Sequence, residues 1–292
     1  MSSSTGRFHF LLKTAISPLA RFWIRMSAPA LITLTTDFGT QDGYVAAMKG
    51  VMLSATPTLR FIDLTHEVAP QDVMEAAFLL KTAAWEFPPG TVHLVVVDPG
   101  VGTDRRPVAI RAGGHYFVGP DNGLFSLLLD GDGIDAGVTL DPAQIGPDDR
   151  LSTTFHGRDL FAPAAAHIAA GGTLDELGTP LDELTALHWA LPIPDAEGIR
   201  GWVVHIDHFG NCITNIPRPL LDKRRSGRGV TCYVGTGVVR GLRETYGTVD
   251  KGEPLLVVGS SDFLEIAVNS GNAAAMLNIR KGAPVNLVFK EQ

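Results

Sequence analysis

Aspartates stand at or near the ends of three predicted strands. Asp37 follows the first strand, Asp63 lies near the end of the second, and Asp98 follows the third. Parallel strands place their carboxyl ends along one edge of a sheet, where ligands of α/β proteins bind. A carboxylate at that edge can accept the two hydroxyls of a ribose, coordinate a metal ion or cap the next helix. Because three converge, we expect a ligand pocket there rather than three separate turns.

The segment after the third strand combines a carboxylate, two glycines and two arginines. It reads Asp98-Pro-Gly-Val-Gly-Thr-Asp-Arg-Arg106. The glycines let the backbone pass close to a ligand, and Arg105 and Arg106 add fixed positive charge beside Asp98. A tight turn with a surface ion pair is the plainer interpretation. The phosphate-loop pattern GxxxxGK[ST] is absent, as is GxGxxG with a downstream acid, which disfavours phosphoryl transfer and nicotinamide chemistry.

A second polar segment, Ser152-Thr-Thr-Phe-His-Gly-Arg-Asp159, stands directly before a predicted alanine-rich helix. A lone histidine is more often packed or hydrogen-bonded than catalytic. The start of a helix, however, presents backbone N–H groups to anions and polar substrate atoms. This position makes His156 a candidate functional residue.

A third segment, His205-Ile-Asp-His-Phe-Gly-Asn211, lies in a predicted turn between strands. Asp207, His208 and Asn211 are either metal ligands or parts of an Asx-rich turn. His66-Glu67 begins a zinc-like motif, but the residue four beyond His66 is Pro70, so HExxH is not completed. We therefore expect no metal site.

The elements that position these segments alternate between strands and helices in the first part of the chain. An apolar run at 92–97 is typical of a strand buried on both faces of a parallel sheet. The alternation predicts a layered α/β domain with a mostly parallel sheet and right-handed crossovers. The predicted strands are 31–35, 59–64, 92–97, 108–111 and 115–118, and the predicted helices are 43–55, 73–86 and 161–170.

A proline-punctuated stretch near 188–200 divides the chain, and the pattern after it is that of strands throughout. We expect an α/β catalytic domain over 30–190, a linker over 191–200 and a smaller all-β, barrel-like, substrate-binding domain over 201–292. The predicted strands of this second domain are 201–206, 230–234, 254–258, 263–268 and 284–289.

Composition narrows the class of protein further. Of the 292 residues 45% are hydrophobic, enough for a substantial core. Lys and Arg total 24 against 31 Asp and Glu, a formal net charge of −7, and no basic stripe is present, which argues against nucleic-acid binding. Cys212 and Cys232 form neither a CxxC pair nor a disulfide framework, so we expect a cytoplasmic protein. We also expect no membrane association.

Residues 1–29 differ from the rest, because they are basic and contain no acidic residue. Lys13 and Pro18 interrupt their apolar runs, so neither a membrane span nor a secretion signal fits. A transit-like leader is one interpretation. We favour a start assigned too early, since Met26 directly precedes the first strand, and we expect the segment to be poorly ordered.

Six motifs, in this order and spacing, resemble the S-adenosyl-L-methionine (SAM) hydroxide adenosyltransferases, the hydrolytic relatives of the fluorinases and chlorinases. The resemblance covers about residues 30–290. The motifs are Thr35-Thr-Asp-Phe-Gly39, Asp98-Pro-Gly-Val-Gly-Thr-Asp-Arg-Arg106, Pro120-Asp-Asn-Gly-Leu124, Thr154-Phe-His-Gly-Arg-Asp159, Asp207-His-Phe-Gly-Asn211 and Glu265-Ile-Ala-Val-Asn269.

The resemblance implies an α/β domain followed by a β-barrel domain, and an enzyme that splits SAM with water into adenosine and L-methionine without a cofactor. It implies a homotrimer whose substrate lies between the first domain of one subunit and the second domain of the next. Asp98, Arg105 and His156 match the family's catalytic positions, and Asp37 matches its ribose-binding carboxylate. The positions that match methionine and adenine contacts are Asp207, Asn211, Tyr246, Ser261, Glu265, Asn269 and Ser270.

Three alternatives remain. A chloride- or fluoride-using halogenase is disfavoured because a carboxylate at Asp98 would repel the halide and because Arg111-Ala-Gly-Gly-His115 leaves no room for the fluorinase insertion. A non-catalytic adenosine- or SAM-binding protein would have no need of the matching Asp98, Arg105 and His156. A metal-dependent hydrolase using Asp63, His66 and Asp207 ranks last.

Overall fold

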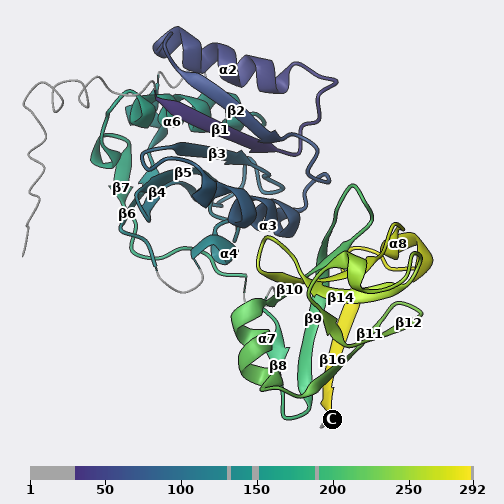
Figure 1. Ribbon diagram of the computed structural model, residues 1–292. Helices are drawn as coiled ribbons and strands as arrows, with labels where there is room; N and C mark the ends of the chain where they lie inside the picture. The colour runs from purple at the N-terminus through teal and green to yellow at the C-terminus, as the bar shows by residue number, and fades with distance from the viewer. Residues whose placement is uncertain (1–29, 130–132, 147–150, 188–190, 291–292) are drawn as a thin grey trace, which may run out of the picture.

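The computed structural model describes residues 30–129, 133–146, 151–187 and 191–290. The expectations for residues 1–29 lie outside these ranges. Two sheets organise the described chain, and Figure 1 shows them as separate lobes, the first formed by the N-terminal and the second by the C-terminal part.

The first sheet has seven strands in the order β2-β1-β3-β5-β4-β6-β7. β2, β1, β3 and β5 run parallel, whereas β4, β6 and β7 extend the sheet by antiparallel pairing. The predicted α/β class with a mostly parallel sheet is confirmed. The strands are β1 (Leu31–Thr36), β2 (Arg60–Thr65), β3 (Val92–Val96), β4 (Pro107–Ala112), β5 (His115–Pro120), β6 (Ala136–Leu140) and β7 (Gly178–Pro180).

Helices cover both faces of this sheet. On one face α2 (Tyr44–Ala55) packs against α6 (Ala162–Ala169), and on the other lies α3 (Val73–Ala83), followed by the 3-10 turn η1 (Ala84–Glu86) (Figure 1). Alternate residues of β3 enter the two cores, as Leu94 and Val96 face α2 and α6 while Val95 faces α3. The continuous apolar run of this strand follows from its burial on both faces. The shorter helices are α4 (Ser126–Leu129), α5 (Pro142–Ile145) and η4 (Leu174–Glu176).

A buried polar chain ties three strands together in the first half of their length. Thr33 Oγ1 lies 2.7 Å from His93 Nδ1, and His93 Nε2 lies 3.1 Å from His115 Nδ1. Burial, with the neighbouring His115, lowers the pKa of His93 to about 3. His93 is therefore neutral and serves as a hydrogen-bonding pivot within the sheet.

The second sheet has nine strands, with eight in the order β12-β11-β16-β9-β10-β15-β14-β13 and β8 paired to β9. β12 also lies against β14, so the two ends of the order approach each other and the sheet is nearly a closed barrel. The predicted barrel-like class is confirmed. The strands are β8 (Ile193–Pro194), β9 (Gly198–Ile206), β10 (Cys212–Pro217), β11 (Gly229–Val234), β12 (Gly237–Arg240), β13 (Leu242–Arg243), β14 (Pro254–Val258), β15 (Phe263–Val268) and β16 (Pro284–Lys290).

Two helices interrupt the strands of this second part, α7 (Arg218–Arg225) and α8 (Ala273–Met276), with a 3-10 turn, η6 (Tyr246–Thr248). The expectation of strands throughout was wrong at α7, because the charged residues of this short helix conceal its helical period. The range expected as a linker, 191–200, contains β8 and the first residues of β9.

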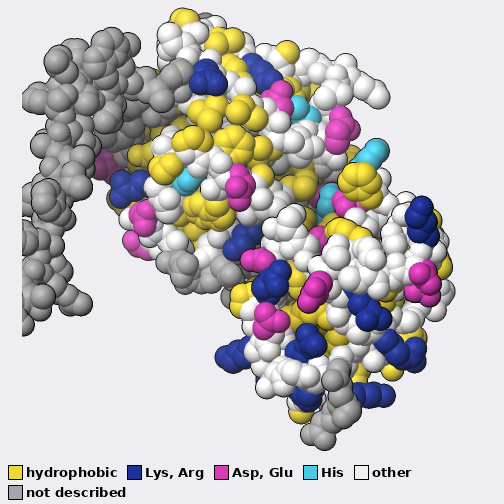
Figure 2. Space-filling view, viewed as in Figure 1, with side chains coloured by type: hydrophobic (Ala, Val, Ile, Leu, Met, Phe, Trp, Pro, Cys, Tyr) yellow, Lys and Arg dark blue, Asp and Glu magenta, His cyan; other side chains and the backbone are white. Residues whose placement is uncertain are grey.

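The surface carries charge in mixed form. In the view of Figure 2, Lys and Arg side chains over the second lobe are scattered among acidic ones rather than gathered into a stripe. None of the helices within the described ranges is long and apolar enough to cross a membrane.

Candidate active site

Asp98, Arg105 and His156 form one connected group beyond the carboxyl end of β3. Arg105 Nε donates to both Asp98 oxygens at 2.9 Å, and Arg105 Nη2 donates to Asp98 Oδ2 at 2.5 Å. The same Nη2 lies 2.7 Å from His156 Nδ1. Only 6% of the Asp98 side chain and 8% of the Arg105 side chain are exposed. The guanidinium thus joins a carboxylate and an imidazole that are 58 positions apart in the chain.

The charge of Arg105 helps to determine the protonation state of His156. Burial and the adjacent guanidinium lower the pKa of His156, against the opposing pull of Asp98 and Asp159. The imidazole is therefore neutral near pH 7, and Nδ1 accepts the Arg105 hydrogen bond. Its proton then resides on Nε2. Arg105 also lies over the Phe161 ring, 5.2 Å from its centroid, which fixes the guanidinium plane.

Two glycines allow the segments to approach each other. Gly102 has φ +76, and a Cβ at this position would lie 2.7 Å from the Thr153 carbonyl oxygen. The loop bearing Asp98 and Arg105 therefore touches the backbone that leads to His156. Gly157 opens the π-helical turn η3 (Gly157–Phe161) and lies against Phe155, Met48 and Val96.

Asp37 follows β1 at the same edge of the sheet. Its Oδ2 accepts the Gln71 N–H at 2.8 Å, and Oδ1 accepts no hydrogen bond from any part of the chain that the structure describes. His66 brackets the turn, because its Nδ1 lies 2.9 Å from Thr36 Oγ1 and its carbonyl accepts the Gly39 N–H at 2.8 Å. Asp37 thus has a fixed backbone and one available carboxylate oxygen.

An aromatic contact connects the Asp37 turn to the His156 turn. The Phe38 and Phe155 rings, each adjacent to one of these residues, meet edge to face with centroids 5.8 Å apart. Tyr44 of α2 contacts both rings. The structure therefore brings all four predicted residues of the first domain to one edge of the sheet.

The second domain contributes a separate hollow of about 560 Å³. Asp207 stabilises the turn in which it lies. Its Oδ1 accepts hydrogen bonds from the Phe209 and Asn211 backbone N–H groups, and its Oδ2 accepts one from Asn211 Nδ2 at 3.0 Å. Of the predicted residues, the hollow is lined by Asp207, Asn211, Tyr246, Glu265 and Ser270.

Two carboxylates give this hollow an acidic character. Tyr246 OH donates to Glu265 Oε2 at 2.8 Å. Burial raises the pKa of Glu265, the Tyr246 hydrogen bond opposes the rise, and the nearby Asp207 charge adds to it. Burial and the Glu265 contact raise the pKa of Tyr246 to about 12, so its hydroxyl remains protonated. Such a hollow suits a cationic group, for example an α-ammonium.

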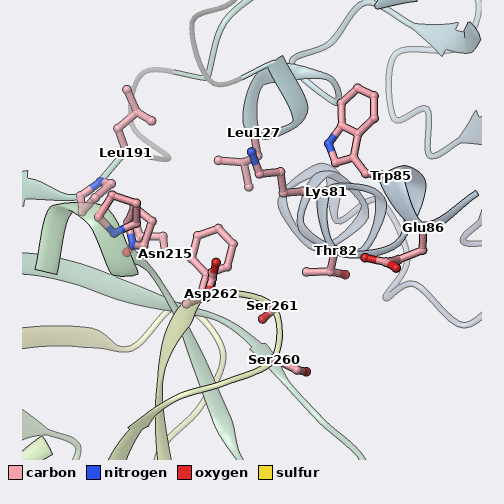
Figure 3. Close-up of a pocket in the computed structure, with 14 residues that line it drawn as sticks. Lys81, Thr82, Trp85, Glu86, Leu127, Leu191, Asn215, Ser260, Ser261 and Asp262 are labelled. Carbon is pink, nitrogen blue, oxygen red and sulfur yellow. The ribbon is translucent and has the colours of Figure 1, made fainter. Parts of the chain in front are cut away.

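Two predicted residues lie outside the lining of this hollow. Asn269 holds neighbouring loops together, since its Nδ2 donates to the Val249 carbonyl at 2.8 Å and its Oδ1 accepts from Ser270 Oγ. Ser261 lines a different pocket, of about 340 Å³, between the two domains. Figure 3 shows Ser261 on the loop opposite Trp85 and Glu86. The adjacent Ser260 lines both pockets and was missed by sequence reasoning, which had only the Ser-Ser pair as a signal.

The two predicted sets remain separate within one chain. Among the described residues, no hydrogen bond or ion pair connects Asp37, Asp98, Arg105 or His156 with the residues of the second-domain hollow. The two domains meet at α3, where Glu75 bonds to His205 and Lys281 and Phe78 packs against Val204 and Phe263.

The candidate metal ligands do not assemble. Lys49 Nζ lies 2.6 Å from Asp63 Oδ2, and His66 Nε2 lies 3.0 Å from Asp63 Oδ1, while Asp207 belongs to the second domain. Within the described ranges, no group of three His, Cys, Asp or Glu side chains could hold a metal ion.

Comparison with known proteins identifies relatives over most of the chain. Residues 32–178 match the SAM hydroxide adenosyltransferase N-terminal domain, and residues 201–286 match the corresponding C-terminal domain. The chain is 41% identical to an (R)-S-adenosyl-L-methionine hydrolase of Salinispora tropica over 264 residues, which cover 88% of this chain and 97% of the relative. A protein of the same description from Thermus thermophilus is also 41% identical over 261 residues, which cover 87% of this chain and 97% of the relative.

A more distant relative is a fluorinase of an Actinoplanes species, 29% identical over 88% of this chain and 97% of the relative. Among solved structures, an uncharacterized conserved protein from Thermotoga maritima superposes with a TM-score of 0.81 at 37% identity, covering 88% of this chain and 99% of that one. Both domains match the same family, and the sequence identity to the hydrolases extends over nearly their whole length. The chain belongs to the SAM hydroxide adenosyltransferase family.

Proposed function

We propose that Asp98, Arg105 and His156 form the catalytic group with which this chain hydrolyses SAM to adenosine and L-methionine. The observation that carries the proposal is the single guanidinium that bonds to both Asp98 and His156 at the carboxyl edge of the sheet. That edge is where ligands of parallel sheets bind, and the group is largely shielded from solvent.

The reaction is a substitution at C5′ of the substrate. A water oxygen forms a bond to C5′, the C5′–S bond breaks, and its electron pair returns to sulfur. The sulfonium thus leaves as the neutral thioether of methionine and needs no general acid. One proton of the water is released. Catalysis therefore depends on holding the water in line with the breaking bond and on taking up that proton.

The three side chains divide these tasks. Arg105 cannot act as a base, because a guanidinium does not deprotonate near neutral pH. It holds Asp98 and His156 and stabilises hydroxide character on the attacking oxygen. Neutral His156 presents its Nε2–H to orient the water oxygen, and the Asp98 carboxylate, the anion of the group, accepts the proton.

The remaining predicted residues bind the substrate. The available Oδ1 of Asp37 accepts a ribose hydroxyl, and the acidic hollow with Asp207 and Glu265 receives the methionine ammonium. Asn211 and Tyr246 contact the adenine and methionine portions. Ser261, Asn269 and Ser270 complete these contacts by side chain or backbone.

The separation of the two sets within one chain supports a shared site. We propose a homotrimer in which the first domain of one subunit and the second-domain hollow of the next enclose one substrate. We also propose a cytoplasmic location for this enzyme.

The decisive experiment is turnover in ¹⁸O-labelled water with and without chloride, followed by mass spectrometry. We expect adenosine with one ¹⁸O at the 5′ position, formed equally in both conditions. A 5′-chloro product would make the protein a halogenase, and bound SAM without any product would make it a binding protein.

The role of Asp98 is tested in the same assay. Asp98→Asn should lower kcat about a hundredfold or more and change KM far less, because a base acts mainly in the transition state. The matched control is Asp121→Asn, which removes the charge of a buried carboxylate paired with the exposed Arg106 of the same loop. A preserved kcat in Asp98→Asn with raised KM would overturn the catalytic assignment.

A further inference from the structure

A buried carboxylate lies where the two domains of one chain meet. Glu75, in the first turn of α3, accepts from His205 Nδ1 of β9 at 2.9 Å and from Lys281 Nζ at 2.6 Å. Its Oε2 also accepts the Ala69 N–H at 3.0 Å. One side chain of the first domain therefore bonds to two separate segments of the second (α3 faces the second lobe in Figure 1).

On the first-domain side, this cluster leads directly to Asp37. Asp72 caps α3 by accepting the Glu75 N–H at 2.8 Å, and its other oxygen lies 2.7 Å from Lys281 Nζ. The preceding residue, Gln71, has φ +67 and gives its N–H to Asp37. The backbone that fixes the Asp37 carboxylate is thus the backbone that fixes the Glu75 cluster.

On the second-domain side, the cluster leads to Asp207. His205 stands two residues before Asp207 at the end of β9, just ahead of the turn that shapes the hollow. The His205 ring stacks on Phe78 of α3 with centroids 5.7 Å apart, and Phe78 meets Phe263 of β15. This packing holds the His205 ring in the orientation that bonds to Glu75.

Burial of the Glu75 carboxylate carries a desolvation cost. A carboxylate with a side chain only 11% exposed loses hydration, a loss that the adjacent apolar contact of Phe78 with Val204 and Phe263 does not incur. The bond from His205 holds α3 against the end of β9, and the bond from Lys281 holds it against the segment before β16. Glu75 therefore fixes α3 relative to two parts of the second domain.

We infer that Glu75 is a positioning residue, which aligns the Asp37 turn of a chain with the Asp207 hollow of the same chain. This inference rests on the proposed function, because it takes both residues as substrate-binding. In the proposed trimer these two half-sites serve neighbouring active sites, so the angle between the domains decides how well each hollow meets the adjoining catalytic group.

Glu75→Gln tests the inference, since it keeps the shape of the side chain and removes its charge. We expect KM for SAM to rise about tenfold and kcat to stay within about twofold, because substrate and transition state lose the same binding contacts. The matched control is Glu176→Gln, which breaks a histidine–glutamate contact of the same 2.9 Å length on the exposed surface of the first domain. Its KM should not change.

A second pair of variants separates positioning from stability. His205→Asn keeps an N–H donor near the position of Nδ1, and His205→Leu removes it. We expect His205→Asn to retain a near-normal KM and His205→Leu to resemble Glu75→Gln, all measured well below the unfolding temperature of each variant.

A lowered Tm with unchanged KM in Glu75→Gln and His205→Leu would overturn the inference and leave a purely structural contact. That result is distinguishable from failure of the proposed function, for which Asp98→Asn would keep its kcat whatever Glu75 variants do.

Discussion

At the scale of single residues, Arg105 decides the chemistry available to its neighbours. A histidine beside a carboxylate alone would have its pKa raised and would act as an acid–base group near pH 7. Here the guanidinium stands between the two, and burial together with Arg105 lowers the pKa of His156. The imidazole is therefore a fixed neutral donor, and negative charge is concentrated on Asp98.

This electrostatic order predicts the pH dependence of the site. Protonation of Nδ1 would break the Arg105 hydrogen bond and place two cations in contact, so activity should fall only when the pH drops below the lowered pKa of His156. We expect the acidic limb of kcat/KM to lie below pH 6.5, the ordinary value for histidine.

The His156 Cε1 proton, followed by NMR in the free enzyme, measures the same ionisation without turnover. In Arg105→Gln the midpoint should move upward, because the opposing charge is gone while Asp98 remains. A wild-type midpoint at or above pH 6.5 would contradict the assigned role of Arg105.

Residue identity could be predicted from the sequence where a motif surrounds it. Asp98, Arg105 and His156 lie in glycine-containing segments after a strand or before a helix, and the structure brings them together. Ser260 could not be predicted as a lining residue, because strand periodicity does not say which member of a Ser-Ser pair faces the hollow. The role of Glu75 could not be predicted, since its partners at 205 and 281 are distant in the sequence.

At the scale of elements, the site depends on how closely the loop after β3 approaches the segment before α6. Gly102 makes this contact possible through both its positive φ and its lack of a Cβ. We expect Gly102→Ala to lower the free energy of unfolding by about 2 kcal/mol. It should also lower kcat by up to about a hundredfold, since the loop would carry Arg105 away from His156.

Gly90→Ala is the matched control for this variant. Gly90 has φ +88, but a Cβ there would meet nothing within 4 Å. It should show the cost of backbone strain, about 1 kcal/mol, with normal kcat. Chemical denaturation and steady-state kinetics measure both quantities, and equal kcat values for the two variants would show that the close approach at Gly102 is unimportant.

Elements with a clear hydrophobic period were predicted well, and those defined by tertiary contacts were not. β3 and α3 start where their apolar patterns start, and the Asp72 side chain caps α3. β10 and α7 were not predicted. β10 is defined by its pairing with β9 and β15, which its sequence does not reveal. The π-helical turn at Gly157–Phe161 likewise has no sequence period that separates it from an α-helix.

At the scale of the whole molecule, Glu75 connects the domain that carries Asp98 with the domain that carries the Asp207 hollow. In the proposed function, the first domain supplies the catalytic group and the ribose-binding carboxylate, and the second domain supplies the acidic hollow. In this proposal each site takes one half from a neighbouring subunit, which the proposed ring of three copies supplies.

Mixed assemblies test this directly. Asp98→Asn removes the first-domain half of a site and Asp207→Ala removes the second-domain half, so each variant alone should be nearly inactive. When the two are co-expressed, every mixed trimer contains one interface with both halves intact. Random assembly should therefore restore about a quarter of the wild-type kcat per subunit. If each site is formed within a single chain, no subunit in the mixture is intact and activity will stay at the level of the separate variants.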